Sequence, residues 1–138
     1  MQNILADAGP LIALFRKSDR YRPAARRFFE SYRGRVLTTW PVVAEVCYML
    51  GFSAERQTAF LTWIQRGGLQ VVDLNAQGVA RVIDLMRKYA DQPMDLADAS
   101  LVWLAEREDV TDVITIDRRD FLAYRLSSGK AFRNVFTR

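Results

Sequence analysis

Short apolar runs alternate with longer amphipathic stretches along this chain. Aliphatic and β-branched residues fill short runs at residues 3–6, 35–38, 69–74 and 110–116. Their length and composition are typical of buried strands. Apolar residues recur at helical spacing over residues 11–16, 23–32, 54–66, 76–89 and 95–107, and up to residue 50 from a cap at residue 38 or 39. Strands that alternate with helices predict an α/β fold, in which helices cover both faces of a parallel sheet.

Turn and capping residues separate these segments. Gly34, Gly51 and the pair Gly67 and Gly68 end helical stretches, and Pro93 interrupts the chain before the helix that begins near residue 95. A short helix over residues 118–124 and an edge strand over residues 131–136 complete the pattern. The sheet is therefore expected to have four to five strands. The length suits one hydrophobic core, and we predict a single domain over residues 1–138.

The composition excludes several kinds of chemistry. Half of the residues are hydrophobic, and the chain has one cysteine and no histidine. A disulfide framework is excluded, which fits a reducing cytosol. The absence of histidine excludes serine–histidine and cysteine–histidine nucleophile systems, histidine zinc sites and histidine general bases.

The charge favours a nucleic-acid partner. The formal net charge is +4, and all but three of the 20 basic residues are arginine. Arginine presents a planar fork that fits phosphate oxygens, and the alternative explanation is an arginine-rich genome or ordinary solvated helix faces. No apolar stretch approaches the roughly 20 residues that span a bilayer, and the N-terminus lacks a signal-peptide pattern. We expect a soluble, cytoplasmic protein with no membrane partner.

Four lone acids end or interrupt apolar runs, and they are the residues most informative about function. They are Asp7, Glu45, Asp98 and Asp117. An ionised carboxylate in apolar surroundings is costly unless a partner compensates it. Four such acids in one small chain indicate a shared cation, and hard oxygen ligands suit Mg²⁺ or Mn²⁺.

The predicted fold brings these acids together. Ligand sites of open α/β sheets lie beyond the carboxyl ends of the strands. Asp7 ends the first predicted strand and Asp117 the fourth, Asp98 lies in the first turn of a helix, and Glu45 lies in the middle of one. Metal ions in such a pocket activate water for phosphodiester hydrolysis, a mechanism that requires no histidine. We predict these four acids as catalytic and metal-binding residues.

Neighbouring polar residues have structural or supporting interpretations. Asp95 and Asp120 are interpreted as helix caps, with Asp95 also supporting the site. Thr115 lies two residues before Asp117 and is expected to hydrogen-bond a metal-binding carboxylate. Arg118 and Arg119 follow Asp117 and are predicted to contact phosphates, the alternative being an ordinary exposed turn. Three predicted ligands also have a structural alternative: Asx-turn formation for Asp7, pairing with an arginine for Glu45, and a favourable position in the first turn of a helix for Asp98.

The order and spacing of these acids resemble the PIN domain family, specifically the VapC-like toxins of bacterial type II toxin–antitoxin pairs. The matching stretches are LADAGPLIAL (residues 5–14), VAEV (43–46), DLADASLV (95–102) and ITIDRRDF (114–121). Each stretch alone is weakly specific, but the four in this order are strongly specific. The resemblance covers nearly the whole chain.

The resemblance implies a Mg²⁺- or Mn²⁺-dependent endoribonuclease with an RNA substrate. It also implies a homodimer, and inhibition by a cognate antitoxin whose C-terminal segment occupies the active-site groove. By position, the acidic quartet of the family falls on Asp7, Glu45, Asp98 and Asp117. The family often has Ser or Thr directly after the first Asp, where this chain has Ala8, so Thr115 is left as the main support of Asp7.

Two other classes of function remain open at the level of sequence. A non-catalytic PIN-like module would bind RNA through its arginines and keep the acids only for the fold, which the intact quartet argues against. A phosphoacceptor signalling domain also has acids at strand ends, but it requires paired acids near the first strand and a lysine after a late one. Only Asp7 lies at the first strand, and Lys130 is poorly placed for the second requirement.

Overall fold

The computed structural model describes residues 2–137, apart from the side chain of Arg118. Its strands are β1 (Asn3–Ala6), β2 (Arg35–Thr39), β3 (Gln70–Val72), β4 (Asp112–Ile114) and β5 (Arg133–Asn134). They form one five-stranded sheet in the order β3-β2-β1-β4-β5, and every pair of neighbours is parallel. The α/β fold with a parallel sheet is therefore confirmed.

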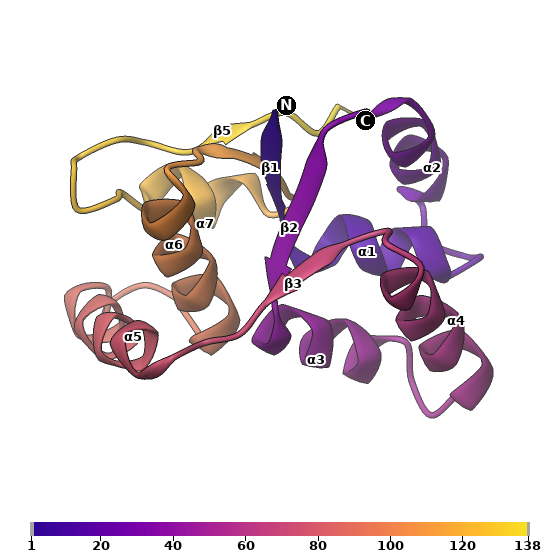
Figure 1. The fold of residues 1–138 in the computed structure, drawn as a ribbon, viewed down its shortest axis with the longest axis horizontal. Helices are drawn as coiled ribbons and strands as arrows, with labels where there is room; N and C mark the ends of the chain where they lie inside the picture. The colour runs from indigo at the N-terminus through magenta and orange to yellow at the C-terminus, as the bar shows by residue number, and fades with distance from the viewer. Residues whose placement is uncertain (1, 138) are drawn as a thin grey trace.

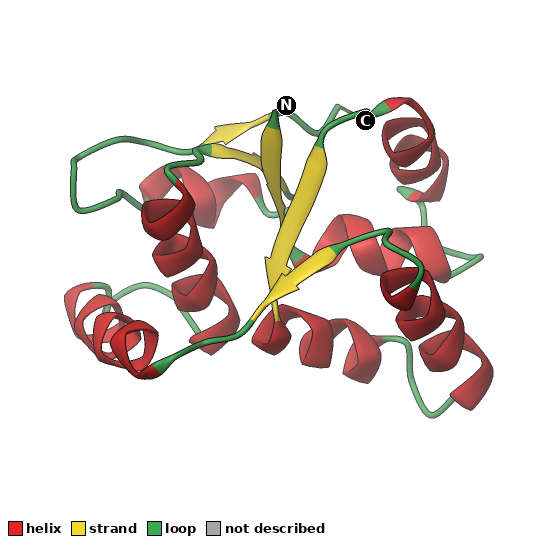
Figure 2. Cartoon of the chain, in the orientation of Figure 1, coloured by secondary structure: helices red, strands yellow, loops and turns green. Residues whose placement is uncertain are grey.

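Six of the seven helices described lie in two groups on either side of this sheet. They are α1 (Ala8–Phe15), α2 (Arg22–Ser31), α3 (Trp40–Met49), α4 (Ala54–Gln65), α5 (Ala76–Lys88), α6 (Leu96–Glu108) and α7 (Arg118–Ala123). In Figure 1, α5, α6 and α7 lie on one side of the strands, and α1, α2 and α4 on the other. Figure 2 shows the strands as the layer between the two groups. None of the helices described is long and apolar enough to cross a bilayer.

The core is centred on β1 and α6. Ile4 and Leu5 of β1 have almost no exposed surface, because helices cover both faces of the strand. In α6, the eight buried residues include the run from Ala99 to Ala105. The register pairs Leu5 with Leu37 of β2 on one side and with Val113 of β4 on the other. The carboxyl ends of these three strands therefore meet at one edge of the sheet.

Two element boundaries differ from the sequence prediction in ways that affect this edge. Helix α1 begins at Ala8 rather than at residue 11, directly after β1, because proline is compatible with a first helical turn. Within that turn, a Cβ on Gly9 would lie only 3.0 Å from Cβ of Ile116. Strand β4 ends at Ile114 rather than at residue 116, because the backbone N–H of Thr115 donates to the side-chain Oδ1 of Asn134.

The core covers only part of the apolar side of α5. Val82 and Leu85 are buried, but Val79, Ile83 and Met86 each expose at least two fifths of their surface. The helix is amphipathic as predicted, and its apolar stripe is wider than the surface that the core covers.

Candidate active site

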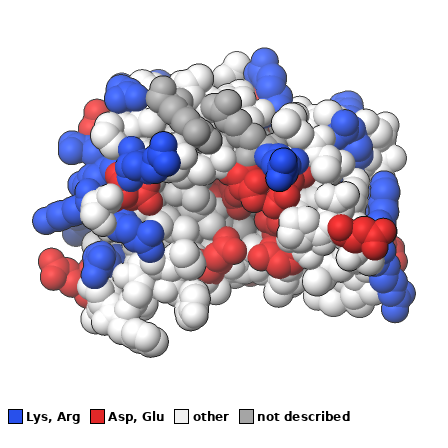
Figure 3. Space-filling view, turned by 180° about the vertical axis from the view of Figure 1, so that it is seen from behind, with Lys and Arg blue, Asp and Glu red and all other residues white. Residues whose placement is uncertain are grey.

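A cavity of about 480 Å³ opens at the carboxyl edge of the sheet. Its acidic lining residues are Asp7, Asp19, Glu45, Asp95, Asp98, Asp117 and Asp120. Arg16 is the one cation among the described side chains that line it. Figure 3 shows acidic side chains gathered near the middle of one face, with basic side chains on both sides of them and most densely at the left of the view. All four acids of the predicted quartet thus face one cavity.

Asp7 lies deepest in this cavity. It directly follows β1, it is 7% exposed, and its backbone N–H donates to the carbonyl of Ile114 at 3.0 Å. The hydroxyl of Thr115, itself fully buried, donates to Asp7 Oδ2 at 2.8 Å. Burial raises the pKa of the Asp7 carboxyl, and the hydrogen bond from Thr115 opposes that rise.

Thr115 connects the end of β1 to the segment that follows β4. Its hydroxyl donates to Asp7 and accepts the backbone N–H of Asp117 at 3.0 Å. The hydrogen bond to a site carboxylate that the sequence spacing predicts is therefore present. Because both partners use the same oxygen, the hydroxyl fixes one carboxylate oxygen of Asp7 relative to the backbone of the β4–α7 connection.

Asp98 is held from the opposite side of the cavity. It lies in the first turn of α6, and the hydroxyl of the fully buried Tyr124 donates to its Oδ2 at 3.0 Å. Burial raises the pKa of the Asp98 carboxyl to about 8, and the charges of Asp7 and Asp95 add to the rise. Asp98 therefore retains a proton at neutral pH unless a cation compensates its charge.

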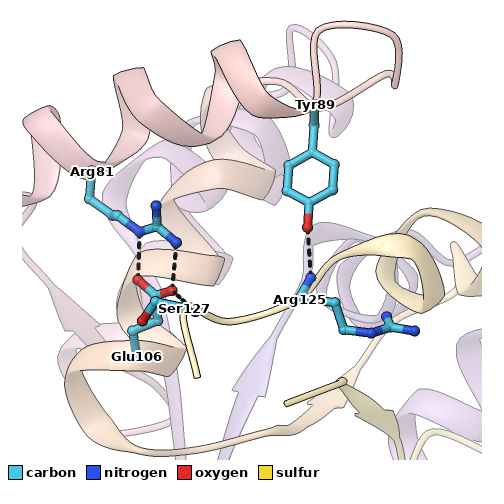
Figure 4. A network of polar contacts seen from close by, with 5 residues as sticks. All are labelled: Arg81, Tyr89, Glu106, Arg125 and Ser127. Carbon is cyan, nitrogen blue, oxygen red and sulfur yellow. Dashed lines mark hydrogen bonds and ion pairs between the residues drawn. The ribbon is translucent and has the colours of Figure 1, made fainter. Parts of the chain in front are cut away.

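A polar network supports the segment that carries Tyr124. The hydroxyl of Tyr89, at the end of α5, accepts the backbone N–H of Arg125 at 2.9 Å (Figure 4). The guanidinium of Arg81 donates two hydrogen bonds of 2.8 Å to the carboxylate of Glu106, which links α5 to α6. Glu106 also accepts the backbone N–H of Ser127. The chain on the C-terminal side of α7 is thus tied to two helices.

Glu45 completes the set from α3. It is half-buried, and burial together with the charges of Asp7 and Asp95 raises the pKa of its carboxyl to about 7. Among the described side chains, which exclude that of Arg118, Glu45 forms none of the ion pairs, so the arginine partner considered from the sequence is not found there.

Helices α6 and α7 each begin with two aspartates three residues apart, and the first aspartate of each pair is the N-cap. Asp95 is the N-cap of α6, and its Oδ1 accepts the backbone N–H of Asp98 at 2.9 Å, as predicted. The cap assigned to Asp120 was wrong, because Asp117 is the N-cap of α7 and its Oδ1 faces the N–H of Asp120 at 3.4 Å. Asp117 also lies beyond β4 and is exposed rather than continuing a buried strand. It still lines the cavity.

Of the two arginines predicted to contact phosphates, the structure places the side chain of Arg119 alone. Arg119 is exposed in the first turn of α7 and is not among the residues that line the cavity. The side chain of Arg118 lies outside the described part of the chain.

Sequence reasoning missed two residues of the site. Tyr124 follows Phe121 at helical spacing, which indicates burial, and a buried tyrosine hydroxyl requires a partner. Arg16 follows the last turn of α1, and its guanidinium donates to the backbone carbonyl of Met49 at the end of α3. No local pattern predicts that this arginine faces the acids, since the contact joins residues 33 positions apart.

The donor set suits a hard divalent cation. Carboxylate oxygens from separate elements line the cavity, and oxygen ligands of this kind are those that Mg²⁺ and Mn²⁺ prefer. The raised pKa values of Asp7, Glu45 and Asp98 show that their negative charges lie close together in a poorly hydrated place. Among the described residues, no three acidic or thiol side chains are already arranged around one metal position. The chemistry of the residues nevertheless fits a divalent cation.

The fold and the site together define an α/β protein with an acidic cavity at the carboxyl edge of its parallel sheet. A family model described as "PIN domain" matches residues 4–125. The chain therefore belongs to the PIN domain family.

Known relatives agree with this assignment. The chain is similar to Ribonuclease VapC26 of Mycobacterium tuberculosis, with 27% identity over 131 residues that cover 94% of this chain and 97% of the relative. Its fold is similar to that of VapC20 of M. tuberculosis, described as a sarcin-ricin loop cleaving toxin, with a TM-score of 0.76, 15% identity and coverage of 84% and 91%. It is also similar to a chain of the DNA-bound VapBC complex of Salmonella typhimurium, with a TM-score of 0.68, 17% identity and coverage of 97% and 98%.

Proposed function

We propose that this protein is a Mg²⁺- or Mn²⁺-dependent endoribonuclease and the toxin of a toxin–antitoxin pair. It hydrolyses RNA phosphodiester bonds with water, in the cytoplasm, through a single nuclease domain over residues 1–138. The observation that carries the proposal is the convergence of Asp7, Glu45, Asp98 and Asp117 on one cavity in a chain without histidine. The names of the similar proteins, a VapC ribonuclease and VapC toxins, support the same activity.

In this proposal the four carboxylates have two different roles. Asp7 and Asp98 are the principal metal ligands, because each is oriented by a buried hydroxyl donor, Thr115 and Tyr124 respectively. Glu45 and Asp117 complete the site or position the attacking water. The bound cation supplies a Lewis acid and lowers the pKa of water. The acids themselves hold negative charge ready at the cavity, which the proton on Asp98 compensates until metal binds.

Cleavage of RNA tests the proposal directly. Labelled RNA is incubated with the wild-type protein in Mg²⁺ or Mn²⁺, with and without a chelator, and compared with Asp7→Asn and Asp98→Asn. We expect cleavage that the chelator abolishes and a loss of at least about a hundredfold in each variant. Asp84→Asn is the matched control, since Asp84 is exposed on α5. Persistent cleavage by both site variants would reject the metal ligands, and an inactive wild type that binds RNA would identify a binding module.

The proposed protein partners are a cognate antitoxin and a second copy of the chain. Similar structures include toxin–antitoxin complexes, such as one from Klebsiella pneumoniae. Tyr48, Met49 and Phe52 are exposed where α3 is followed by α4, and exposed apolar groups of this size mark interaction surfaces. Co-purification with the product of the adjacent gene and light scattering of the isolated chain test the two partners. A chain that is monomeric and binds no such product would contradict both.

A further inference from the structure

The basic residues are unevenly distributed along the chain. Residues 16–35 contain eight Lys or Arg and two Asp or Glu, a net charge of +6 within a chain whose total is +4. The remainder of the chain is therefore acidic by two charges. This segment comprises the turn after α1, helix α2 and the start of β2. The excess of positive over negative charge thus lies in this one segment, because acids outnumber bases in the rest of the chain.

A second cavity, of about 550 Å³, opens between this segment and α4. We call it the basic groove. Its charged lining residues are Lys17, Arg22 and Arg56, with Glu55 as the one acid, and Ser18 and Ser53 add hydroxyl groups. Three cations against one anion make it the opposite of the acidic cavity.

The two cavities share the α1–α2 turn as a wall. Arg16 and Asp19 of this turn line the acidic cavity, whereas Lys17, Ser18 and Arg22 line the basic groove. The turn is rigidly built, since the carboxylate of Asp19 accepts the backbone N–H of residue 21 at 2.8 Å and its carbonyl accepts that of Arg22 at 3.1 Å. Consecutive residues, Arg16 and Lys17, therefore line the acidic cavity and the basic groove respectively.

The cations of the groove are available to a ligand. Of the ion pairs formed by residues 2–137, none includes Lys17, Arg22 or Arg56. Lys17 and Arg56 are exposed, and Arg22 is half-buried. Positive charges that the protein leaves unpaired beside an acidic catalytic pocket suit an anion that extends out of that pocket.

We propose that the basic groove is a subsite for the RNA strand, which holds phosphates next to the scissile bond while that bond lies in the acidic cavity. This inference rests on the proposed ribonuclease function. A strand entering a pocket lined by carboxylates is repelled, so phosphates on one side of the cut require compensating cations. Arg16, on the shared wall, is placed to contact the phosphate between the two cavities.

The test removes groove charge without touching the site. Lys17→Gln/Arg56→Gln is compared with Arg66→Gln/Arg87→Gln, which removes the same charge from exposed positions at the end of α4 and on α5. KM and kcat are measured with a long single-stranded RNA and with a dinucleotide-length substrate between about 0.05 and 0.2 M salt. Binding of the long RNA without metal is followed by fluorescence anisotropy.

For the long RNA, we expect the groove variant to raise KM about tenfold with kcat unchanged. Its binding should show a logarithmic salt slope shallower by about 1.4, or about 0.7 for each lost phosphate contact. The control variant and the short substrate should show neither change. Equal effects of both double variants, with cleavage intact, would overturn the subsite and leave the function standing. RNA binding that depends on the groove, in a wild-type protein that cleaves no RNA, would support the subsite and overturn the proposed ribonuclease function. Weakened antitoxin binding with unchanged RNA kinetics would assign the groove to the protein partner and overturn the subsite.

Discussion

The hydroxyl of Thr115 offers a sharp test of how the site is held together. Thr115→Val replaces the hydroxyl with a methyl group of nearly the same volume, at a position with no exposed surface. It removes the donor 2.8 Å from Asp7 Oδ2 and the acceptor 3.0 Å from the backbone N–H of Asp117. The fold loses no apolar contact, so the change isolates the hydrogen bonds.

The structure sets the expected size of the effect. A hydrogen bond to a charged group contributes about 1.5–3 kcal/mol, and removing a residue that orients a metal ligand lowers metal affinity by about ten- to a hundredfold. The hydrogen bond from Thr115 also lowers the pKa of Asp7, so its loss lets that pKa rise further. Because a proton then competes better with metal, the pH at which cleavage reaches half its maximum should move upward.

Isothermal titration with Mn²⁺ and cleavage rates at varied Mn²⁺ measure the effect, and urea denaturation measures the free energy of unfolding. Thr38→Val is the matched control. Thr38 is equally buried, on β2, but its hydroxyl donates to the neutral carbonyl of Ala6 at 2.8 Å. We expect the control to lose about 1 kcal/mol of stability with unchanged metal affinity.

Two results would refute the reasoning. Unchanged Mn²⁺ affinity in a folded Thr115→Val protein would show that the hydroxyl does not orient Asp7 for metal. An equal loss of affinity in Thr38→Val would show that the effect belongs to strand packing in general.

Three further predictions concern the surroundings of the site. Tyr124→Phe removes the donor 3.0 Å from Asp98 Oδ2, so Mn²⁺ affinity in calorimetry should fall several-fold, whereas equal affinity would exclude a positioning role. Burial raises the pKa of Asp98 from 3.8 to about 8, so this proton favours the folded state fully below about pH 4, and that contribution is lost as the pH rises through about 8. In chelator, Tm should thus be lower at about pH 8.5 than at about pH 6, and Mg²⁺ should raise Tm more at the higher pH; a flat profile would contradict the shift. Arg81→Gln breaks the paired hydrogen bonds to Glu106, so urea denaturation should show a loss of about 2 kcal/mol with the cleavage rate per folded molecule unchanged, and a slower rate would place the pair in the site.

The sequence predicts the strands best where both of their faces are buried. Strand β1 has the predicted bounds, and β2 extends one residue further, because a continuous apolar run requires burial on both sides. Strand β4 is shorter than predicted because Asn134 takes the hydrogen bond of Thr115, a contact between residues 19 positions apart that no local pattern encodes. Periodicity likewise predicts that α5 is amphipathic, but it does not show which part of the apolar stripe the core covers.

For the acids of the site too, local sequence predicts the contacts within a helix turn but not the contacts between distant residues. Asp95 and Asp98 have the same spacing as Asp117 and Asp120, and in both pairs the first residue caps the helix. Applying one capping rule to both pairs would have predicted the second cap correctly. The donor on Asp98 required knowledge of the fold, because Tyr124 is 26 residues away.

The strand order explains why the four acids meet. Strand β1 lies between β2 and β4, so the helices that follow these three strands all begin at one edge of the sheet. Asp7 follows β1, Glu45 lies on the helix after β2, and Asp117 caps the helix after β4, while α6 presents Asp98 to the same cavity. The repulsion between these charges opposes folding, and the buried hydroxyls of Thr115 and Tyr124 only partly relieve it. A cation that binds this site reduces the repulsion and so stabilises the fold, which is why the two variants that weaken metal binding, Thr115→Val and Tyr124→Phe, should also lose part of the stabilisation that the metal gives.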